Sequence, residues 1–415
     1  MNLSLPDAAG WAELCNGDGE FALAARHWDG GLRISIGDAT LSMTLGDGVA
    51  SGADPGAGAG VLGFTGPPAL WEKLLAAEPP PYHNDIAPLL ANGLERTGDR
   101  VLHAQYYPAV MRALELLRPG MPGAAPMRDE RTDPGHFDSP TGRYVHVTLA
   151  GHDHRVYFEE AGTGIPLLLQ HTAGSHGSQW RHLFEIPEIT SRFRLIAYDL
   201  PFHGKSLPPL TRAWWSEPYR LTGEFLRSVP VALAQTLALD RPVFMGCSVG
   251  GLLALDLALH HPEVFRAVIA VEGALWIPDS VSSYPEFWHP QVSNDYKARV
   301  MDGLMAPSSP IAYRRETTFA YASGWPAAFL GDLHYYMEGY DLRERAGDID
   351  TSRIGVHILS GEYDFSGTPE LGRAAHEAIP GSTWQKMKGV GHFPMSENPM
   401  GFIEHLLPVL ARLGA

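Results

Sequence analysis

Short apolar segments, separated by segments with helical periodicity, make up the chain from about residue 143 to its end. The expected strands are Arg143–Leu149, His154–Glu159, Pro166–Gln170, Arg194–Tyr198, Val243–Gly246, Ala267–Val271 and Val356–Ser360. The last four are nearly continuous apolar runs, which is typical of parallel strands buried on both faces. The expected helices are Leu221–Leu239, Gly251–His260, Thr368–Ala378 and Gly401–Leu413. This alternation predicts an α/β domain over residues 143–415, with a mostly parallel sheet, an antiparallel start and helices on both faces.

One part of this domain, from about residue 275 to 348, interrupts the alternation. It is rich in Trp, Tyr and Phe and contains no clear buried strand. We interpret it as a helical insertion that forms a cap over the sheet.

The first 125 residues have a different pattern. Leu32–Ile36 and Leu41–Leu45 alternate apolar and polar residues, which predicts an antiparallel strand pair. The helical patterns that follow are Pro68–Ala77, Asp85–Ala91 and Pro108–Leu117. We therefore expect a small N-terminal α+β domain over residues 1–125, joined to the larger domain by a Pro-rich, charged linker over residues 126–142.

The composition excludes several classes of protein. The chain of 415 residues has 31 Lys and Arg against 47 Asp and Glu, a net charge of −16 that repels phosphate backbones, so we expect no nucleic-acid partner. No apolar run approaches the roughly 20 residues of a membrane span, and the first residues do not form a secretory signal. Two cysteines, Cys15 and Cys247, make neither a disulfide framework nor a zinc site. We expect a cytoplasmic protein that acts on a small molecule.

The segment Val243–Gly251 carries the strongest chemical signal. It fits Gly-x-Ser-x-Gly around Ser248, at the end of a buried strand and the start of an apolar helix. Small neighbours allow the serine to occupy a strained turn, and the free N–H groups of the helix start can receive an oxyanion. The sequence therefore predicts that Ser248 is a nucleophile.

A serine hydroxyl needs a base, and the base needs a third group that orients it. His392 stands between Gly391 and Phe393 in a Gly-His turn, 28 residues after Asp364, which follows the strand Val356–Ser360. We favour Asp364 over Glu362 as the acid, because Glu362 lies closer to the strand end. Ser248, Asp364 and His392 form the expected triad.

Residues 143–415 resemble the α/β-hydrolase superfamily, specifically its branch of capped serine esterases and carbon–carbon-bond hydrolases. The stretches that carry the resemblance are Gln170–Gly174 with Trp180, Tyr198–Ser206, the turn at Ser248 and the Gly-His turn at His392. The order Ser, Asp, His along the chain is also that of this fold. Because position 248 is a serine, the chain differs from the relatives that use an aspartate nucleophile, the haloalkane dehalogenases and epoxide hydrolases.

The resemblance also implies an oxyanion hole made by the N–H groups of Ala173 and Val249. Thr172 stands where these enzymes usually have glycine, so which N–H points inward is open at this stage. Thr172, Trp276 and Trp288 are the expected substrate contacts, in a pocket lined by apolar residues of the cap.

The N-terminal strand pair, the segment Phe64–Trp71 and the helix Pro108–Leu117 resemble the sterol-carrier-like fold. That resemblance implies an apolar cavity for a lipid-like molecule. A packing or oligomerisation module, through which the protein forms a homodimer, is the other interpretation of this region.

The expected activity is hydrolysis of a carboxylic ester-type bond of a largely apolar small molecule, through an acyl-enzyme and with no metal or organic cofactor. Two other reactions would use the same triad: carbon–carbon cleavage of a diketone or ring-cleavage product, and acyl transfer to an acceptor other than water. A lipid-binding protein is the alternative without catalysis. The sequence does not choose the substrate.

Overall fold

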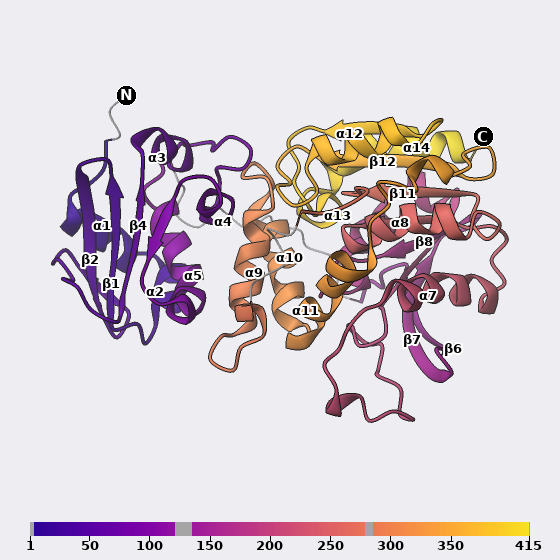
Figure 1. The fold of residues 1–415 in the computed structure, drawn as a ribbon, viewed down its shortest axis with the longest axis horizontal. Coiled ribbons are helices and arrows are strands. Elements are labelled where there is room, and N and C mark those ends of the chain that lie inside the picture. The colour runs from indigo at the N-terminus through magenta and orange to yellow at the C-terminus, as the bar shows by residue number, and fades with distance from the viewer. Residues whose placement is uncertain (1–3, 121–134, 279–284, 415) are drawn as a thin grey trace. The chain divides into compact units, whose positions relative to one another are not determined.

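The computed structural model describes residues 4–120, 135–278 and 285–414. The chain divides into two compact units (Figure 1). Unit 1 comprises Met1–Met127 and Pro285–Gly303, and unit 2 comprises Arg128–Tyr284 and Leu304–Ala415.

Unit 2 is built on a sheet of eight strands. They are β6 (Thr141–Leu149), β7 (His152–Ala161), β8 (Ile165–Gln170), β9 (Phe193–Tyr198), β10 (Val243–Cys247), β11 (Ala267–Val271), β12 (Gly355–Gly361) and β13 (Thr383–Met387). Their order is β13-β12-β11-β10-β8-β9-β7-β6. All neighbours pair in parallel except β6 with β7 and β7 with β9. The predicted fold class, a mostly parallel sheet with an antiparallel start, is confirmed.

Helices cover both faces of this sheet. Side chains such as Leu167 and Leu169 point to one face, where they pack against η1 (Gly177–Glu185), α6 (Pro187–Thr190) and α14 (Pro399–Leu413). The helices of the opposite face include α7 (Gly223–Thr236), α8 (Val249–His260) and α12 (Pro369–Ala378). Successive strand residues are thus buried on alternate sides, which explains why these strands read as continuous apolar runs.

The sequence did not predict strand β13. Its residues, Thr-Trp-Gln-Lys-Met, include only one that is fully buried, because β13 lies at the edge of the sheet. An edge strand can keep polar side chains in water, so it lacks the apolar signal of the central strands.

The region expected as the cap is helical. Within unit 2 it contains α10 (Ile311–Ser323), α11 (Pro326–His334), one π-helical turn, η5 (Tyr335–Gly339), and the short η6 (Ala346–Asp348). A smaller 3₁₀ turn, η2 (Trp214–Ser216), lies before α7, and α13 (Pro394–Glu397) follows the predicted catalytic histidine.

Unit 1 has its own sheet, in the order β3-β2-β1-β4-β5. The strands are β1 (Gly30–Ile36), β2 (Ala39–Gly46), β3 (Val49–Ser51), β4 (Val61–Gly66) and β5 (Glu95–Thr97). The antiparallel pairing of β1 with β2 confirms the predicted strand pair. The helices are α1 (Ala8–Asn16), α2 (Gly19–Ala25), α3 (Pro68–Leu74), α4 (Ile86–Leu90) and α5 (Arg100–Glu115). The sequence predicted that this last helix begins at Pro108. Pro108 instead lies inside α5, which begins eight residues earlier, at Arg100.

The structure divides the chain differently from the predicted domain boundaries. Part of the expected cap, Pro285–Gly303, belongs to unit 1 and contains η4 (Pro285–Trp288) and α9 (Asn294–Gly303), which packs against α5. Most of the expected linker lies outside the described residues, and its last two residues, Thr141 and Gly142, already belong to β6.

A buried ion cluster fastens α9 to the rest of unit 1. The Arg299 guanidinium contacts Glu115 and Asp302, each at 2.5 Å, and Asp85 at 3.7 Å. Burial lowers the pKa of Arg299, but Glu115 and the other carboxylates outweigh it and raise that pKa overall. Arg299 therefore stays charged, and its stability inside the unit depends on these carboxylates.

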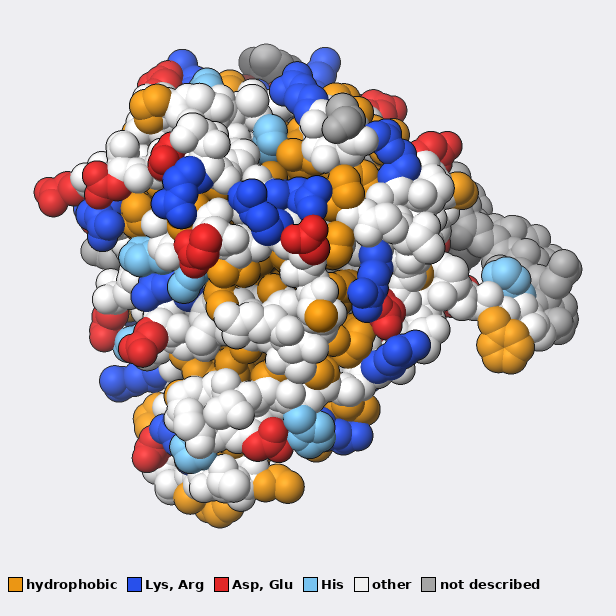
Figure 2. Space-filling view, turned by 90° about the vertical axis from the view of Figure 1, so that its right-hand side faces the viewer, with side chains coloured by type: hydrophobic (Ala, Val, Ile, Leu, Met, Phe, Trp, Pro, Cys, Tyr) orange, Lys and Arg blue, Asp and Glu red, His pale blue; other side chains and the backbone are white. Residues whose placement is uncertain are grey.

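On the face seen in Figure 2, Lys and Arg side chains are interspersed with Asp, Glu and hydrophobic ones.

Among the residues that the structure describes, no helix combines the length and apolarity needed to cross a bilayer.

We predict that Glu115→Ala destabilises unit 1 by about 3 kcal/mol, because it leaves the buried Arg299 without its nearest carboxylate outside α9. Glu20→Ala is the matched control, since Glu20 is 44% exposed and 3.7 Å from Arg112, and its loss should cost less than about 1 kcal/mol. Urea unfolding of the full-length protein, followed by tryptophan fluorescence, measures both. Equal, small effects would contradict the account of α9.

Candidate active site

Ser248 lies in a strained turn between β10 and α8. Its backbone has φ +58° and ψ −113°, a conformation that L-residues rarely adopt and that is found mainly at functional sites. A Cβ at Gly246 would lie 2.3 Å from Gly250 O, and one at Gly250 would lie 2.7 Å from Gln170 Cγ. The glycines of the motif are therefore required by close packing, and they let the turn rest against the end of β8.

His392 and Asp364 come together from the loops after β13 and β12. His392 Nδ1 is 2.6 Å from Asp364 Oδ2, and Asp364 is fully buried. Cys247 Sγ donates to His392 O at 3.1 Å, which places the histidine loop directly beside the turn of Ser248. Burial raises the pKa of Asp364, but the charge and hydrogen bond of His392 outweigh it and hold that pKa below its usual range. Asp364 is therefore a carboxylate suited to orient the imidazole.

The other acid of this loop has a different partner. Glu362 Oε1 is 2.9 Å from Lys386 Nζ, and Glu362 Oε2 accepts a hydrogen bond from Gly389 N at 3.1 Å. The structure thus places Asp364, and not Glu362, against His392.

The segment after β8 has three amide groups in sequence, and two of them are occupied. Thr172 N donates to Gln179 Oε1 at 3.1 Å, and Gly174 N donates to Asp332 Oδ2 at 2.7 Å. Among the described residues, Ala173 N has no acceptor, and neither has Val249 N at the start of α8. Ala173 N and Val249 N are thus without an internal acceptor in the described part of the chain, and their predicted role in receiving an oxyanion stays a prediction.

Cap helix α11 holds this segment through a buried ion pair. Asp332 Oδ2 also lies 2.8 Å from His203 Nε2, and both residues are almost fully buried. His203 Nδ1 donates to Pro201 O at 3.0 Å, so both ring nitrogens are donors. Burial lowers the pKa of His203, but Asp332 raises it overall. A protonated His203 and the Asp332 carboxylate thus connect the cap to the loop after β9.

His171 completes this packing as a neutral ring. Its Nδ1 donates to Thr172 O at 2.7 Å, and its Nε2 accepts from Leu200 N at 3.0 Å. Burial, with the nearby His203, lowers the pKa of His171 well below its usual range. Both nitrogens are used by the backbone, so His171 orders the loop.

Two cap tyrosines reach the reacting groups. The Tyr321 hydroxyl is hydrogen-bonded to Thr172 Oγ1, which in turn is 2.9 Å from Gln179 Oε1. The Tyr336 hydroxyl lies 2.8 Å from Ser248 Oγ and is, among the described residues, its only side-chain hydrogen-bond partner. Neither tyrosine was predicted as a site residue.

A buried glutamate lies beside the acid of the pair. Glu272 follows β11 with φ +54°, and both oxygens of its carboxyl accept from Gly361 N, at 2.9 and 2.8 Å. Burial and the charge of Asp364 raise the pKa of Glu272 well above its usual range. Glu272 therefore supports the strand end that precedes Asp364.

A second buried glutamate supports the histidine loop. Glu397 accepts a hydrogen bond from Gly391 N, next to His392, and another from Ala306 N at 3.1 Å. Burial raises the pKa of Glu397 to about 8. This side chain thus links the loop of the histidine to the segment that follows α9.

The two tryptophans expected to contact substrate, Trp276 and Trp288, have different surroundings. The Arg343 guanidinium is 4.4 Å above the ring of Trp276. Trp288 belongs to unit 1 and is 51% exposed. Their role as substrate contacts stays a prediction, as does that of Thr172, whose hydroxyl and amide are both engaged within the protein.

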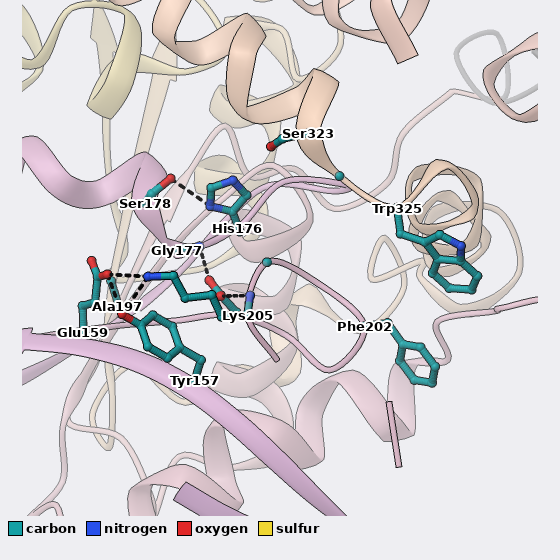
Figure 3. A pocket seen from close by; sticks show the side chains of 13 residues that line it. Tyr157, Glu159, His176, Gly177, Ser178, Ala197, Phe202, Lys205, Ser323 and Trp325 are labelled. Atoms are coloured by element: carbon teal, nitrogen blue, oxygen red, sulfur yellow. Dashed lines mark hydrogen bonds and ion pairs between the residues drawn. The ribbon is translucent and has the colours of Figure 1, made fainter. Parts of the chain in front are cut away.

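A cavity of about 320 Å³ lies on unit 2 beside the oxyanion segment, and Figure 3 shows its lining. Trp325 and Phe202 stand on one side, and Lys205 Nζ is 2.9 Å from Tyr157 Oη and 3.5 Å from Glu159 Oε1 on the other. None of the three predicted catalytic residues lines it. This cavity is therefore distinct from the site of Ser248.

Comparison with known proteins identifies the fold family. The family profile described as alpha/beta hydrolase fold matches residues 165–399. The chain belongs to this family. An uncharacterized protein of Mycobacterium tuberculosis is 27% identical over 274 residues, which cover 61% of this chain and 77% of that protein. A pimeloyl-[acyl-carrier protein] methyl ester esterase of Vibrio vulnificus is 24% identical over 269 residues, covering 61% and 96%.

Solved structures show the same fold. A thermophilic esterase from Thermogutta terrifontis aligns with a TM-score of 0.56 and 21% identity, over 66% of this chain and all of that one. The enol-lactonase from Burkholderia xenovorans aligns with a TM-score of 0.52 and 21% identity, over 64% of this chain and all of that one. The predicted membership of the α/β-hydrolases is confirmed.

We predict that Glu397 makes the protein less stable as the pH rises. The folded protein keeps the Glu397 proton up to about pH 8, while the unfolded chain releases it near pH 4.5, so the folded state binds more protons between these values. Relative to Glu397→Gln, the melting temperature of the wild type should fall by on the order of 5 °C from pH 5 to pH 8.5. A difference that does not change with pH would contradict this.

Glu362→Gln is the control for this series. Lys386 outweighs burial and lowers the pKa of Glu362, so this carboxyl stays ionised across the whole range. Its variant should follow the wild type in the pH dependence of melting.

Proposed function

We propose that this protein is a serine hydrolase that cleaves a carboxylic ester-type bond of a largely apolar small molecule through an acyl-enzyme. The observation that carries the proposal is the arrangement around Ser248. The serine sits in a strained turn, His392 is held at 2.6 Å by the buried carboxylate of Asp364, and the amides of Ala173 and Val249 have no acceptor among the described residues. This is the set of groups that acyl transfer through serine requires.

In the proposed reaction Ser248 Oγ attacks the ester carbonyl while His392 takes its proton. The Asp364 carboxylate keeps the proton on Nδ1 and stabilises the imidazolium. The N–H groups of Val249 and Ala173 receive the negative charge on the carbonyl oxygen, and each such donor is worth roughly 3–4 kcal/mol in the transition state. A water molecule activated by His392 then releases the acid.

Two observations support an ester of apolar character. The ring of Phe393 lies 4.8 Å from that of His392 and 5.3 Å from that of Tyr321, so aromatic side chains surround the reacting groups. The relative from Vibrio vulnificus is named as a methyl ester esterase, and structural neighbours are named as an esterase and an enol-lactonase. All three names describe the cleavage of ester-type bonds.

Chromogenic esters with acyl chains of increasing length test the proposal. We expect turnover by the wild type and a loss of roughly 10⁴-fold or more in kcat for Ser248→Ala, because that variant has no nucleophile. The preferred chain length measures the acyl pocket. Turnover of a diketone with none of any ester, by the folded protein, would instead favour carbon–carbon cleavage.

The acid is tested by a pair of neighbouring variants. Asp364→Asn should lower kcat by on the order of 10³-fold or more, since the imidazole loses the partner that fixes its tautomer. Glu362→Gln should change kcat by less than about threefold, because Glu362 pairs with Lys386. The reverse order would assign the acid to Glu362.

A further inference from the structure

Tyr336 of η5 lies between two anchored tyrosines, Tyr335 in the same turn and Tyr340 directly after it. The Tyr335 hydroxyl donates to Asp256 Oδ2 at 2.9 Å, and the Tyr340 hydroxyl donates to Ala274 O at 2.7 Å. These two anchors fix both sides of a single π-helical turn, an irregularity often found at functional sites. Between them, the Tyr336 hydroxyl lies 2.8 Å from Ser248 Oγ.

Either hydroxyl could donate in this hydrogen bond by its geometry alone, and the surroundings of Tyr336 favour one direction. Burial raises the pKa of Tyr336 above its usual range, although the bond to Ser248 opposes this, so the phenol keeps its proton. Within the described part of the chain, Ser248 Oγ is the only partner of that hydroxyl. A buried O–H without an acceptor is costly, so Tyr336 donates to Ser248 Oγ. The proton of Ser248 itself then remains available for His392.

We propose that Tyr336 is a catalytic residue that promotes release of the serine from the acyl-enzyme; this rests on the proposed ester hydrolysis. In the acyl-enzyme, Ser248 Oγ is the ester oxygen. His392 removes a proton from water as the water oxygen bonds to the acyl carbon. When the resulting tetrahedral intermediate collapses, the bond from carbon to Oγ breaks and its electron pair moves to Oγ. The proton on His392 then passes to Oγ, and Tyr336 keeps its own.

The Tyr336 hydrogen bond strengthens during that collapse, because Oγ gains negative charge as it leaves. Hydrogen bonds to charged oxygens are stronger than those to neutral ones, so the bond stabilises the transition state more than the acyl-enzyme. In the first half of the reaction Oγ also gains negative charge as His392 takes its proton, but Oγ starts there as a hydroxyl oxygen, which accepts this hydrogen bond better than the ester oxygen of the acyl-enzyme does. The bond to Tyr336 therefore strengthens less during acylation than during the collapse. Tyr336 therefore acts mainly on deacylation.

The test is Tyr336→Phe, measured by rapid mixing with a p-nitrophenyl ester that the wild type turns over. Deacylation should slow by at least about tenfold, in the range expected for loss of one donor to a charged oxygen. Acyl-enzyme should accumulate, as seen by a burst of nitrophenol and by the mass of the intact protein. Since kcat and KM then fall together, kcat/KM should stay within about threefold of the wild type.

Tyr340→Phe is the matched control, because it removes a buried hydroxyl from the same segment without contact to Ser248. It should leave the burst and kcat close to those of the wild type. Unchanged deacylation in Tyr336→Phe would overturn the inference, and so would an equal loss in kcat and kcat/KM. A wild type that shows neither ester turnover nor a burst dependent on Ser248 would overturn the proposed function instead.

Discussion

The carboxyl ends of parallel strands meet at one edge of the eight-stranded sheet, and each group proposed to take part in the chemistry depends on that alignment. Ala173 follows β8, Ser248 follows β10, Asp364 follows β12 and His392 follows β13. Residues more than 200 positions apart along the chain thereby follow strands of one sheet at the same edge. Ligands of open α/β sheets bind at this edge for the same reason. The strain of the turn at Ser248 is sustained because buried strands on both sides fix its ends.

Helices α10 and α11, from the region expected as the cap, hold the segment after β8 in place through polar contacts. Asp332 of α11 binds both the amide next to Ala173 and the protonated His203, while Tyr321 binds the hydroxyl of Thr172. A buried ion pair contributes little net stability, because desolvation offsets its attraction. The role of this ion pair is to fix the position of the segment Thr172–Gly174. Asp332 occupies Gly174 N on one side of Ala173, and Gln179 occupies Thr172 N on the other, so α11 and the proposed oxyanion segment form one connected structure.

The sequence was sufficient for seven of the eight strands of the large sheet, all but β13, and for the candidate residues with local signatures. Ser248 has glycines that close packing requires, and His392 follows a turn of recognisable composition, so both could be found from short segments. Glu397 and Tyr336 could not, because each acts through a contact between distant parts of the chain that no local pattern encodes. The segment that contains α9 was placed in the cap because the whole region 275–348 is rich in aromatic residues and lacks a clear strand, and that pattern does not show which unit a helix packs against.

The central claim is that Ser248 is the nucleophile of a covalent reaction. Treating the full-length protein with a fluorophosphonate, which phosphonylates activated serines, and then sequencing its peptides by mass spectrometry tests this most directly. We predict one label on Ser248, formed faster in the wild type than in Asp364→Asn, because the histidine must be oriented to take the proton. A folded protein that is not labelled, or that is labelled at another serine, would contradict the account.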